Sequence, residues 1–329
     1  MVMNHANLKV FLCYNWFVVM GLKCKGEGIL LSDYLFHFDI HDWHSWGKVY
    51  CSKEEFRPLI ERILEQEGLE IWPIENCKPG TNGVFRVGSY VVKVFVPLES
   101  GYDSLPDYKA ELFAMERANG IGVSVPKLIA KGQIQDRYLF RYIIMDYVKG
   151  EMLGEIKDRF GRKQKIAIGK ELSNIVKSWA TACENFNGID VIQRTLNSKR
   201  WEDAPIDVKE AQKKYLEGLD EKSFVFVHGD LNKDNLMVEP GEKVTVLDFA
   251  DALCAPAIYE DMNLICDAFH FDRDFLEGYY GAISTEELLE ISIKAILCHE
   301  FGYHTVKRIL GPVQSMEELR DKMMRKLTV

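Results

Sequence analysis

The spacing of hydrophobic residues along the chain predicts a first part with short strands and a second part with long helices. In the first part, a helical pattern over 53–68 is followed by β-branched runs near 84–87 and 90–96, with a Gly-Ser turn suited to a hairpin between them. A second helical pattern covers 106–119, and an apolar strand beginning at Ile143 runs into a charged, glycine-containing break. The pattern predicts a sheet-rich first lobe.

Beyond that break, helical patterns dominate the sequence. They cover 163–183, 206–219 and several stretches between Tyr259 and Lys326, and the short apolar runs FVFV, NLMV and VTVLDF interrupt them. A helix-rich second lobe with a few short strands is therefore expected, which makes the whole chain an α+β protein.

We expect three units along the chain. Residues 1–52 are rich in aromatic and β-branched residues, which favours strands, and form an N-terminal extension to which the sequence gives no role. Residues 53–148 form the N-lobe, and residues 149–329 form the C-lobe.

The segment with the strongest chemical signal is FVFVHGDLNKDNLMVEPGEKVTVLDFADA, residues 224–252. An apolar strand ends at His228, a loop carries Asp230 and Asn235 five positions apart, and two short strands lead to Asp248. Phosphoryl transfer needs a carboxylate near the attacking hydroxyl and oxygen ligands for magnesium ions. A rigid loop beside a hairpin suits both needs, whereas a lone aspartate in a turn would be solvated.

At these residues the sequence resembles the aminoglycoside phosphotransferase and choline kinase superfamily, relatives of the protein kinases, whose HGDxxxxN loop precedes a strand ending in Asp. The resemblance implies a protein-kinase-like bilobal fold with nucleotide bound in the N-lobe and the acceptor in the C-lobe. It also implies that Asp230 orients or deprotonates the acceptor hydroxyl, that Asn235 and Asp248 bind Mg²⁺, and that His228 braces the loop.

The same resemblance extends upstream to the segment CKPGTNGVFRVGSYVVKVF. Its loop, Gly80, Thr81, Asn82 and Gly83, would fold over the phosphates of a nucleotide, and Lys93 in the next strand would supply a positive charge. Because the glycines do not form a strict G-x-G-x-x-G, a surface hairpin with a solvated lysine is the alternative.

Two further nucleotide contacts follow from chain order in that family. Glu111 in the 106–119 helix is the acidic partner expected for Lys93, with Glu116 as the competing choice. Asp146 and Val148 fall where the family has its interlobe hinge, whose backbone reads the adenine edge.

Acidic residues are concentrated after the predicted catalytic loop. The chain has a net charge of -9, which disfavours nucleic-acid binding, and the window from 248 to 290 holds eleven carboxylates and one basic residue. A cationic acceptor is therefore expected, with Asp251, Glu260 and Asp267 as acceptor-binding residues, although solvated helix faces are the alternative reading. Asp261 is expected to support the catalytic loop.

Other sequence patterns concern the cellular location of the protein and its possible metal sites. Eight scattered cysteines without a CxxC pair suggest reduced thiols in the cytoplasm, and we expect no membrane span and a monomer or homodimer. The group His37, His41 and His44 is weighed as a metal site and set aside in favour of packing or surface roles. His299 and His304 are one residue too far apart for a zinc-protease motif.

These observations predict a small-molecule kinase that moves the γ-phosphate of ATP or GTP, with Mg²⁺, to a hydroxyl of a small cationic molecule. An aminoglycoside is the first expected acceptor, which would make the protein an antibiotic-resistance enzyme. The alternatives are a kinase of choline, an amino acid or a sugar with the same Asp230 machinery, and a nucleotide-binding module without catalysis.

Overall fold

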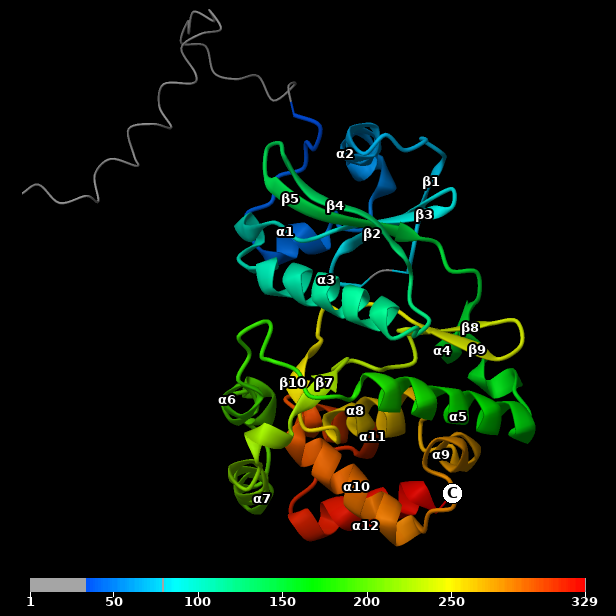
Figure 1. The fold of residues 1–329 in the computed structure, drawn as a ribbon. Coiled ribbons are helices and arrows are strands. Elements are labelled where there is room, and N and C mark those ends of the chain that lie inside the picture. The colour runs from blue at the N-terminus through cyan, green and yellow to red at the C-terminus, as the bar shows by residue number, and fades with distance from the viewer. Residues whose placement is uncertain (1–33, 79, 329) are drawn as a thin grey trace, which may run out of the picture.

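The computed structural model describes residues 34–78 and 80–328, and Figure 1 shows two lobes, one above the other. The first lobe is built on a five-stranded antiparallel sheet in the order β1-β2-β3-β5-β4, and the second is mostly helical. The α+β order predicted from the sequence is confirmed.

The strands of the N-lobe sheet are β1 (Ile74–Asn76), β2 (Gly83–Val87), β3 (Tyr90–Val94), β4 (Leu128–Gln135) and β5 (Leu139–Asp146). The predicted hairpin is present as β2 and β3, with the turn at Gly88. Strand β3 is central, and its register pairs Lys93 with Val84 on one side and Ile143 on the other. Lys93 is therefore held on a strand that is hydrogen-bonded along both edges.

Residues 34–52 belong to the N-lobe, and this corrects two expectations. Phe36, Ile40, Trp46 and Val49 share one hydrophobic core with helix α2 (Lys53–Gln66) and the sheet, so the lobe does not begin at residue 53. Within 34–52 the structure has a helix, α1 (Trp43–Gly47), instead of strands, and the strands expected in 1–33 lie outside the described residues.

A capping box explains why α1 is helical despite its aromatic composition. The backbone N–H of Ser45 donates to Asp42 Oδ1 at 2.7 Å, and the backbone N–H of Asp42 donates to Ser45 Oγ at 3.0 Å. These two bonds satisfy donors at the start of the helix, and this local effect outweighs the strand preference of its tryptophans.

Helix α3 (Leu105–Gly120) confirms the helix predicted at 106–119 and lies between the sheet and the C-lobe (Figure 1). Ala114, Met115 and Ala118 on this helix pack into the core of the C-lobe. Glu111 is buried on the same helix and faces Lys93. The helix therefore joins the two lobes mechanically and carries one partner of the strand lysine.

The C-lobe is made of helices that surround the predicted catalytic loop. Its helices are α4 (Leu153–Ile156), α5 (Arg162–Trp179), α6 (Val191–Leu196), α7 (Ile206–Glu217), α8 (Tyr259–Asn263), α9 (Arg273–Tyr280), α10 (Thr285–Cys298), α11 (Gly302–Leu310) and α12 (Met316–Leu327). Helix α8 continues into a π-helical turn, Leu264–Ala268. None of the helices in the described ranges is long and apolar enough to cross a membrane.

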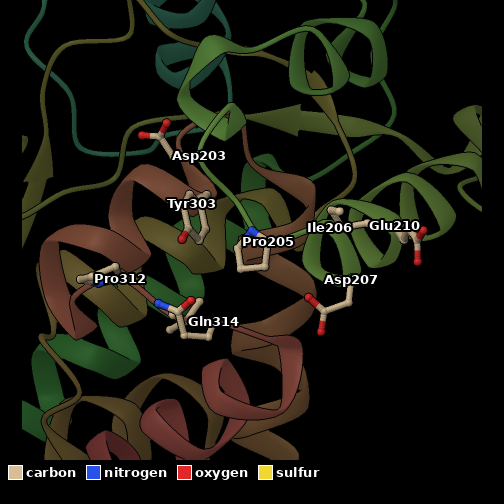
Figure 2. Close-up of a pocket in the computed structure, with 9 residues that line it drawn as sticks. Asp203, Pro205, Ile206, Asp207, Glu210, Tyr303, Pro312 and Gln314 are labelled. Carbon is tan, nitrogen blue, oxygen red and sulfur yellow. The ribbon is translucent and has the colours of Figure 1, made fainter.

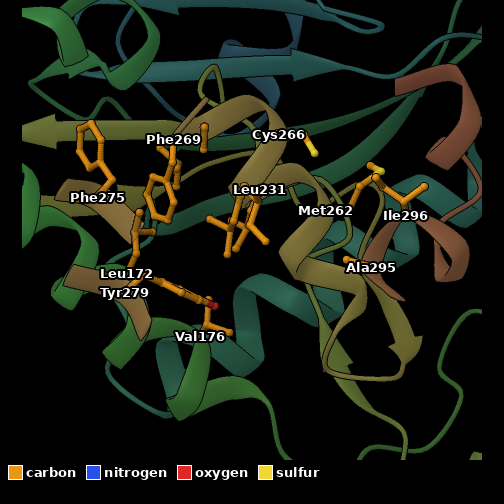
Figure 3. Packing of buried hydrophobic residues seen from close by; sticks show 14 of the residues in the cluster. Leu172, Val176, Leu231, Met262, Cys266, Phe269, Phe275, Tyr279, Ala295 and Ile296 are labelled. Atoms are coloured by element: carbon orange, nitrogen blue, oxygen red, sulfur yellow. The ribbon is translucent and has the colours of Figure 1, made fainter. Parts of the chain in front are cut away.

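Two small sheets carry the predicted catalytic loop between them. One pairs β7 (Val225–Val227) with β10 (Leu253–Ala255), and the other has the order β6-β8-β9, with β6 (Glu151–Met152), β8 (Leu236–Glu239) and β9 (Lys243–Val246). Figure 3 shows Leu231 among the buried side chains of the C-lobe core, and it is fully buried. Because Leu231 directly follows Asp230, packing of the core fixes the position of the loop.

Candidate active site

The loop between β7 and β8 begins at a buried histidine with a defined proton position. The backbone N–H of Asp230 donates to His228 Nδ1 at 3.2 Å, so the other ring nitrogen, Nε2, carries the hydrogen and donates to the carbonyl of Leu247 at 2.9 Å. Burial lowers the pKa of His228 to about 4 and keeps the ring neutral. His228 thus ties the loop to the strand end before Asp248.

Asp230 is surrounded by amide donors. Its Oδ2 accepts hydrogen bonds from Asn232 Nδ2 at 2.8 Å and Asn235 Nδ2 at 3.0 Å, and its Oδ1 accepts one from Asn263 Nδ2 at 3.1 Å. Burial first, and then the negative charge of Asp251, raise the pKa of Asp230 to about 8. Asn263 lies on α8 and carries no sequence signal of its own, because only the fold brings it to the loop.

Gly229 is the point at which the C-lobe holds the loop from behind. It has a φ of +83°, and a Cβ there would lie 2.3 Å from the carbonyl oxygen of Asp251, so a side chain does not fit. The N–H of Gly229 donates to Glu260 Oε1 at 2.6 Å, and its carbonyl accepts from Asn263 Nδ2 and His299 Nε2, both at 3.3 Å.

These contacts correct two predictions about the acidic segment. The support of the loop comes from Glu260, whereas Asp261, predicted for that role, accepts a hydrogen bond from Tyr280 at 2.7 Å. Glu260 had been predicted to bind the acceptor, but it is only 2% exposed and lies behind the loop. The helix turn of α8 decides which of two adjacent carboxylates faces the loop, and the sequence does not show this.

Asp267 is also placed differently from the prediction. Its carboxylate is buried and contacts two cations, Lys233 Nζ at 3.1 Å and an Arg308 nitrogen at 3.0 Å. Although burial acts to raise it, these cations hold the pKa of Asp267 below its ordinary value. Its charge is already compensated within the C-lobe, so we no longer assign it to the acceptor.

Lys93 pairs with two carboxylates, and the pair with Asp248 joins the lobes. Its ammonium contacts Glu111 on α3 and lies 2.8 Å from Asp248 Oδ1 in the C-lobe. Burial alone would lower the pKa of Lys93, but these two carboxylates raise it above its ordinary value, so the charge persists. The competing choice, Glu116, pairs with Lys131 at the surface instead.

Asp248 projects from a strained backbone position into the space between the lobes. Its φ is +57°, and its side chain is 47% exposed although the next residue, Phe249, is buried. Desolvation acts to raise its pKa, but Lys93 and its hydrogen bond lower it, so the carboxylate stays ionised. Asp248 and Asn235 are therefore two oxygen-bearing side chains at one end of the Asp230 loop.

The glycine loop covers this region from the N-lobe. Thr81 accepts a hydrogen bond from Trp46 through its carbonyl, and Asn82 is buried, with Oδ1 accepting from the N–H of Val96 at 3.2 Å. The side chain of Asn82 and the carbonyl of Thr81 thus hold the loop in place, and a ligand would use the other backbone groups of the loop. Lys78 links this loop to the catalytic loop through Asp234, at 2.7 Å.

The predicted hinge lies at the end of β5. Asp146 is exposed and accepts from the backbone N–H of Lys127, while Val148 is partly buried. The backbone N–H of Tyr147, between them, donates to Ser89 at 2.8 Å. The chain crosses from the N-lobe to the C-lobe directly after this point (Figure 1).

Residues of the N-lobe that the sequence did not indicate lie near Asp251. Trp43 of α1 is 50% exposed and contacts Tyr102 edge to face, with ring centroids 5.7 Å apart. Tyr102 donates to Asp107 Oδ2 at 2.8 Å, and burial followed by the charge of Asp251 raises the pKa of Asp107 to about 6. An aromatic pair and a carboxylate of the N-lobe thus lie within electrostatic reach of Asp251.

Asp251 is half-exposed and has one cationic neighbour. Arg194 of α6 lies 3.7 Å from Asp251 Oδ1 and forms a bidentate pair with Glu300, at 2.6 and 2.7 Å. Arg194 is therefore committed mainly to Glu300, and Asp251 keeps a side chain that is 53% exposed.

A separate hollow lies in the C-lobe (Figure 2). Its volume is about 610 Å³, and no predicted site residue lines it. Its lining includes Asp203, Asp207 and Tyr303, of which Asp203 is paired with Lys307. Within residues 34–78 and 80–328, no group of three or more His, Cys, Asp and Glu side chains could hold a metal ion by itself.

Known proteins resemble this chain in sequence profile and in fold. The sequence profile described as "Phosphotransferase enzyme family" matches residues 80–290, whereas no curated protein sequence matches. The solved GDP complex of wild-type aminoglycoside 2'-phosphotransferase-IIIa is 16% identical, with a TM-score of 0.54, and the match covers 82% of this chain and 97% of that chain.

A second solved structure is a thermostable mutant of aminoglycoside phosphotransferase APH(4)-Ia in a ternary complex with ADP and hygromycin B. It is 14% identical, with a TM-score of 0.52, and the match covers 81% of this chain and 97% of that chain. At these identities the likeness establishes the fold, and the kinase-like bilobal fold expected from the sequence is confirmed.

Proposed function

The chain belongs to the phosphotransferase enzyme family, and from this premise we propose that it transfers the γ-phosphate of ATP or GTP to a hydroxyl of a small cationic molecule. The observation that supports the proposal is that Asp248 lies close enough to Asp230 for its negative charge to raise the pKa of Asp230. Amides of Asn235 and Asn263 orient Asp230, and Lys93 holds Asp248.

Asp230 is the residue we assign to the acceptor. Its carboxylate is oriented by three amide donors, so it can hold a hydroxyl in line with the phosphate and receive its proton. Burial raises its pKa to about 8. A general base is most effective when its pKa is close to the pH at which the enzyme works. Positioning and electrostatics supply most of the catalysis in this type of transfer.

Asn235 and Asp248 are the residues we assign to Mg²⁺. Two protein ligands fit an ion that takes its other ligands from phosphates and water, and Asp248 is both ionised and accessible. When bound, the ion supplies positive charge that neutralises phosphate oxygens. The Nδ2 of Asn235 is occupied by Asp230, which directs the amide oxygen of Asn235 away from that carboxylate.

We assign the nucleotide to the region between the glycine loop, residues 80–83, and Lys93. Backbone groups of Gly80 to Gly83 would contact phosphates, Lys93 would add a positive charge, and the backbone of Asp146 to Val148 would contact the base. The ion pair of Lys93 with Glu111 supports this assignment, because it fixes the ammonium in a buried position at the base of the loop.

We place the acceptor between Trp43, Tyr102, Asp107 and Asp251. Exposed aromatic rings and partly exposed carboxylates attract ammonium groups, and Asp251 is close enough to Asp230 to influence its pKa. An aminoglycoside, which carries several ammonium groups, is our first candidate acceptor. The aromatic pair also supports a second candidate, a small amino alcohol such as choline.

The test is nucleotide consumption by the purified protein with Mg²⁺ and either ATP or GTP, measured against a panel of aminoglycosides, choline, amino acids and sugars. We expect turnover with a cationic acceptor. Turnover only with neutral sugars would contradict the acceptor assignment, and nucleotide binding without turnover on any member would favour a non-catalytic module.

A further inference from the structure

We infer that the segment before the matched family region, residues 34–52, is a positioning element for the nucleotide-binding loop, and that Trp46 is the residue through which it acts. The inference rests on the proposed function, because it takes residues 80–83 as a nucleotide contact. It gives a role to a segment that the sequence alone left without one.

The direct contact is a single hydrogen bond from a buried side chain. The indole Nε1–H of Trp46 donates to the carbonyl of Thr81 at 2.9 Å, and Trp46 is 1% exposed. Trp46 is buried, and a buried indole N–H without a partner is costly, so this bond favours one conformation of the loop over others. Thr81 lies between the two glycines whose backbone is assigned to phosphates.

A second contact seats the same segment against the far end of the loop. A Cβ on Gly83 would lie 3.1 Å from the carbonyl oxygen of Tyr50 and 3.0 Å from the ring of Phe85. Residues 46 and 50 therefore contact the loop at both 81 and 83. Such a loop, rich in glycine, loses much conformational entropy on binding, and holding it beforehand reduces that loss.

The segment is itself anchored, so that it can position the loop. The ring of Trp46 packs edge to face on Phe56, with centroids 5.9 Å apart, and the backbone N–H of Ile40 donates to the Tyr138 hydroxyl at 2.8 Å. Asp42 caps α1 from the surface, with a side chain that is 54% exposed. The brace thus runs from α2 and the β4–β5 turn, through α1, to the glycine loop.

Two variants loosen the brace in different ways. Trp46→Phe keeps an aromatic ring in the core and removes the N–H, and Asp42→Ala removes the exposed cap of α1 without touching either the core or the loop. The loss of one hydrogen bond or one cap predicts a nucleotide Kd and KM about three- to tenfold higher, with kcat changed by less than about twofold.

Phe36→Leu is the matched control. Phe36 is fully buried in the same core, and its ring contacts within the described residues are with Phe56, Tyr138 and Phe140, not with residues 80–83. We expect it to lower thermal stability at least as much as Trp46→Phe and to leave nucleotide affinity unchanged. Equal affinity losses in Phe36→Leu and Trp46→Phe would overturn the inference, because they would report general loosening of the lobe.

Hydrogen exchange of the wild-type protein provides a test that does not depend on a variant folding. Addition of nucleotide is expected to protect the backbone amides of 43–50 together with those of 80–83. Protection of 80–83 alone would overturn the inference. If the wild type bound no nucleotide at all, the proposed function would fail. If the wild type bound nucleotide and Trp46→Phe and Asp42→Ala bound it equally well, only the positioning role of residues 34–52 would be rejected.

Discussion

Lys93 and Asp248 form an ion pair between the lobes, with Nζ 2.8 Å from Oδ1. Lys93 is fixed by the central strand β3 and by Glu111 of α3, whereas Asp248 leaves β9 in a left-handed conformation that turns its side chain toward the N-lobe. The pair therefore sets the relative position of the proposed phosphate-binding lysine and the proposed metal ligand. Through Lys93, the side chains of Glu111, Lys93 and Asp248, which are distant in sequence, form one connected unit.

Glu111→Gln tests the buried side of this unit. The variant keeps the shape of the side chain and removes the charge that holds Lys93, so the ammonium is expected to shift toward Asp248 and compete with the metal. We predict that kcat/KM falls roughly ten- to a hundredfold, measured by steady-state kinetics. Glu116→Gln, on the same helix and paired with the exposed Lys131, is the control, and a similar loss there would contradict the assignment.

The pH dependence of activity tests the role of Asp230. Its pKa is raised to about 8 by burial, so its carboxyl is protonated at lower pH and accepts a proton only as pH rises through that value. We predict that kcat/KM for the acceptor rises from about pH 6 to about pH 9 and then levels. Nucleotide affinity, measured over the same range, separates this effect from ionisation of the donor. A profile that falls with pH would contradict the role.

Glu260→Gln tests whether the carboxyl of Glu260, which accepts a hydrogen bond from the Gly229 N–H, is neutral. Burial raises the pKa of Glu260 to about 8, and its Oε2 has no hydrogen-bond partner among the described residues. Because the folded protein binds a proton that the unfolded chain has lost, this residue makes stability fall as pH rises from the ordinary value of 4.5 to about 8.

The glutamine variant keeps the bond to Gly229 and lacks this titration. Urea unfolding is therefore expected to show Glu260→Gln gaining stability over the wild type as pH rises, with activity retained. Glu260→Ala should instead lose about 1–3 kcal/mol, because the Gly229 N–H is left without its partner. Glu286→Gln, which removes a charge from an exposed position of α10, is the control, and an equal pH effect there would point to general charge repulsion.

Trp43→Ala tests the acceptor site. If Trp43 contacts a cationic acceptor, the acceptor KM should rise about five- to thirtyfold, while the nucleotide KM stays constant. Trp72→Ala is the matched control, since Trp72 is equally exposed at 50% and lies beside the β2–β3 turn at Gly88. A nucleotide effect of Trp43→Ala, or an equal acceptor effect of Trp72→Ala, would remove the assignment.

The sequence was most informative where one local pattern determines one structure. The periodicity of 53–68 and 106–119 predicted α2 and α3, and the spacing of Asp230, Asn235 and Asp248 predicted a loop and hairpin that bring them together. It was misleading at α1, where the capping box of Asp42 and Ser45 outweighs aromatic composition. Local interactions of this kind are weak in sequence statistics.

Contacts made only by the tertiary fold were not predictable from spacing. Asn263 and His299 reach Gly229 from α8 and from the residue after α10, and nothing in their neighbourhoods indicates the loop. The acidic segment contains Asp248 and Asp251, whose charges act on Asp230, yet Glu260 and Asp267 in it are committed to a backbone amide and to two cations. Charge counts do not reveal which carboxylates already have partners.

We propose that Asp230 serves the acceptor and makes no contact with the nucleotide. The most direct measurement is nucleotide affinity and turnover of Asp230→Asn in the presence of Mg²⁺, with the wild type alongside and a cationic acceptor that the wild type phosphorylates. We predict an affinity within about twofold of the wild type and a loss of turnover of at least about a thousandfold. Parallel loss of affinity and turnover, or turnover that persists, would contradict the account.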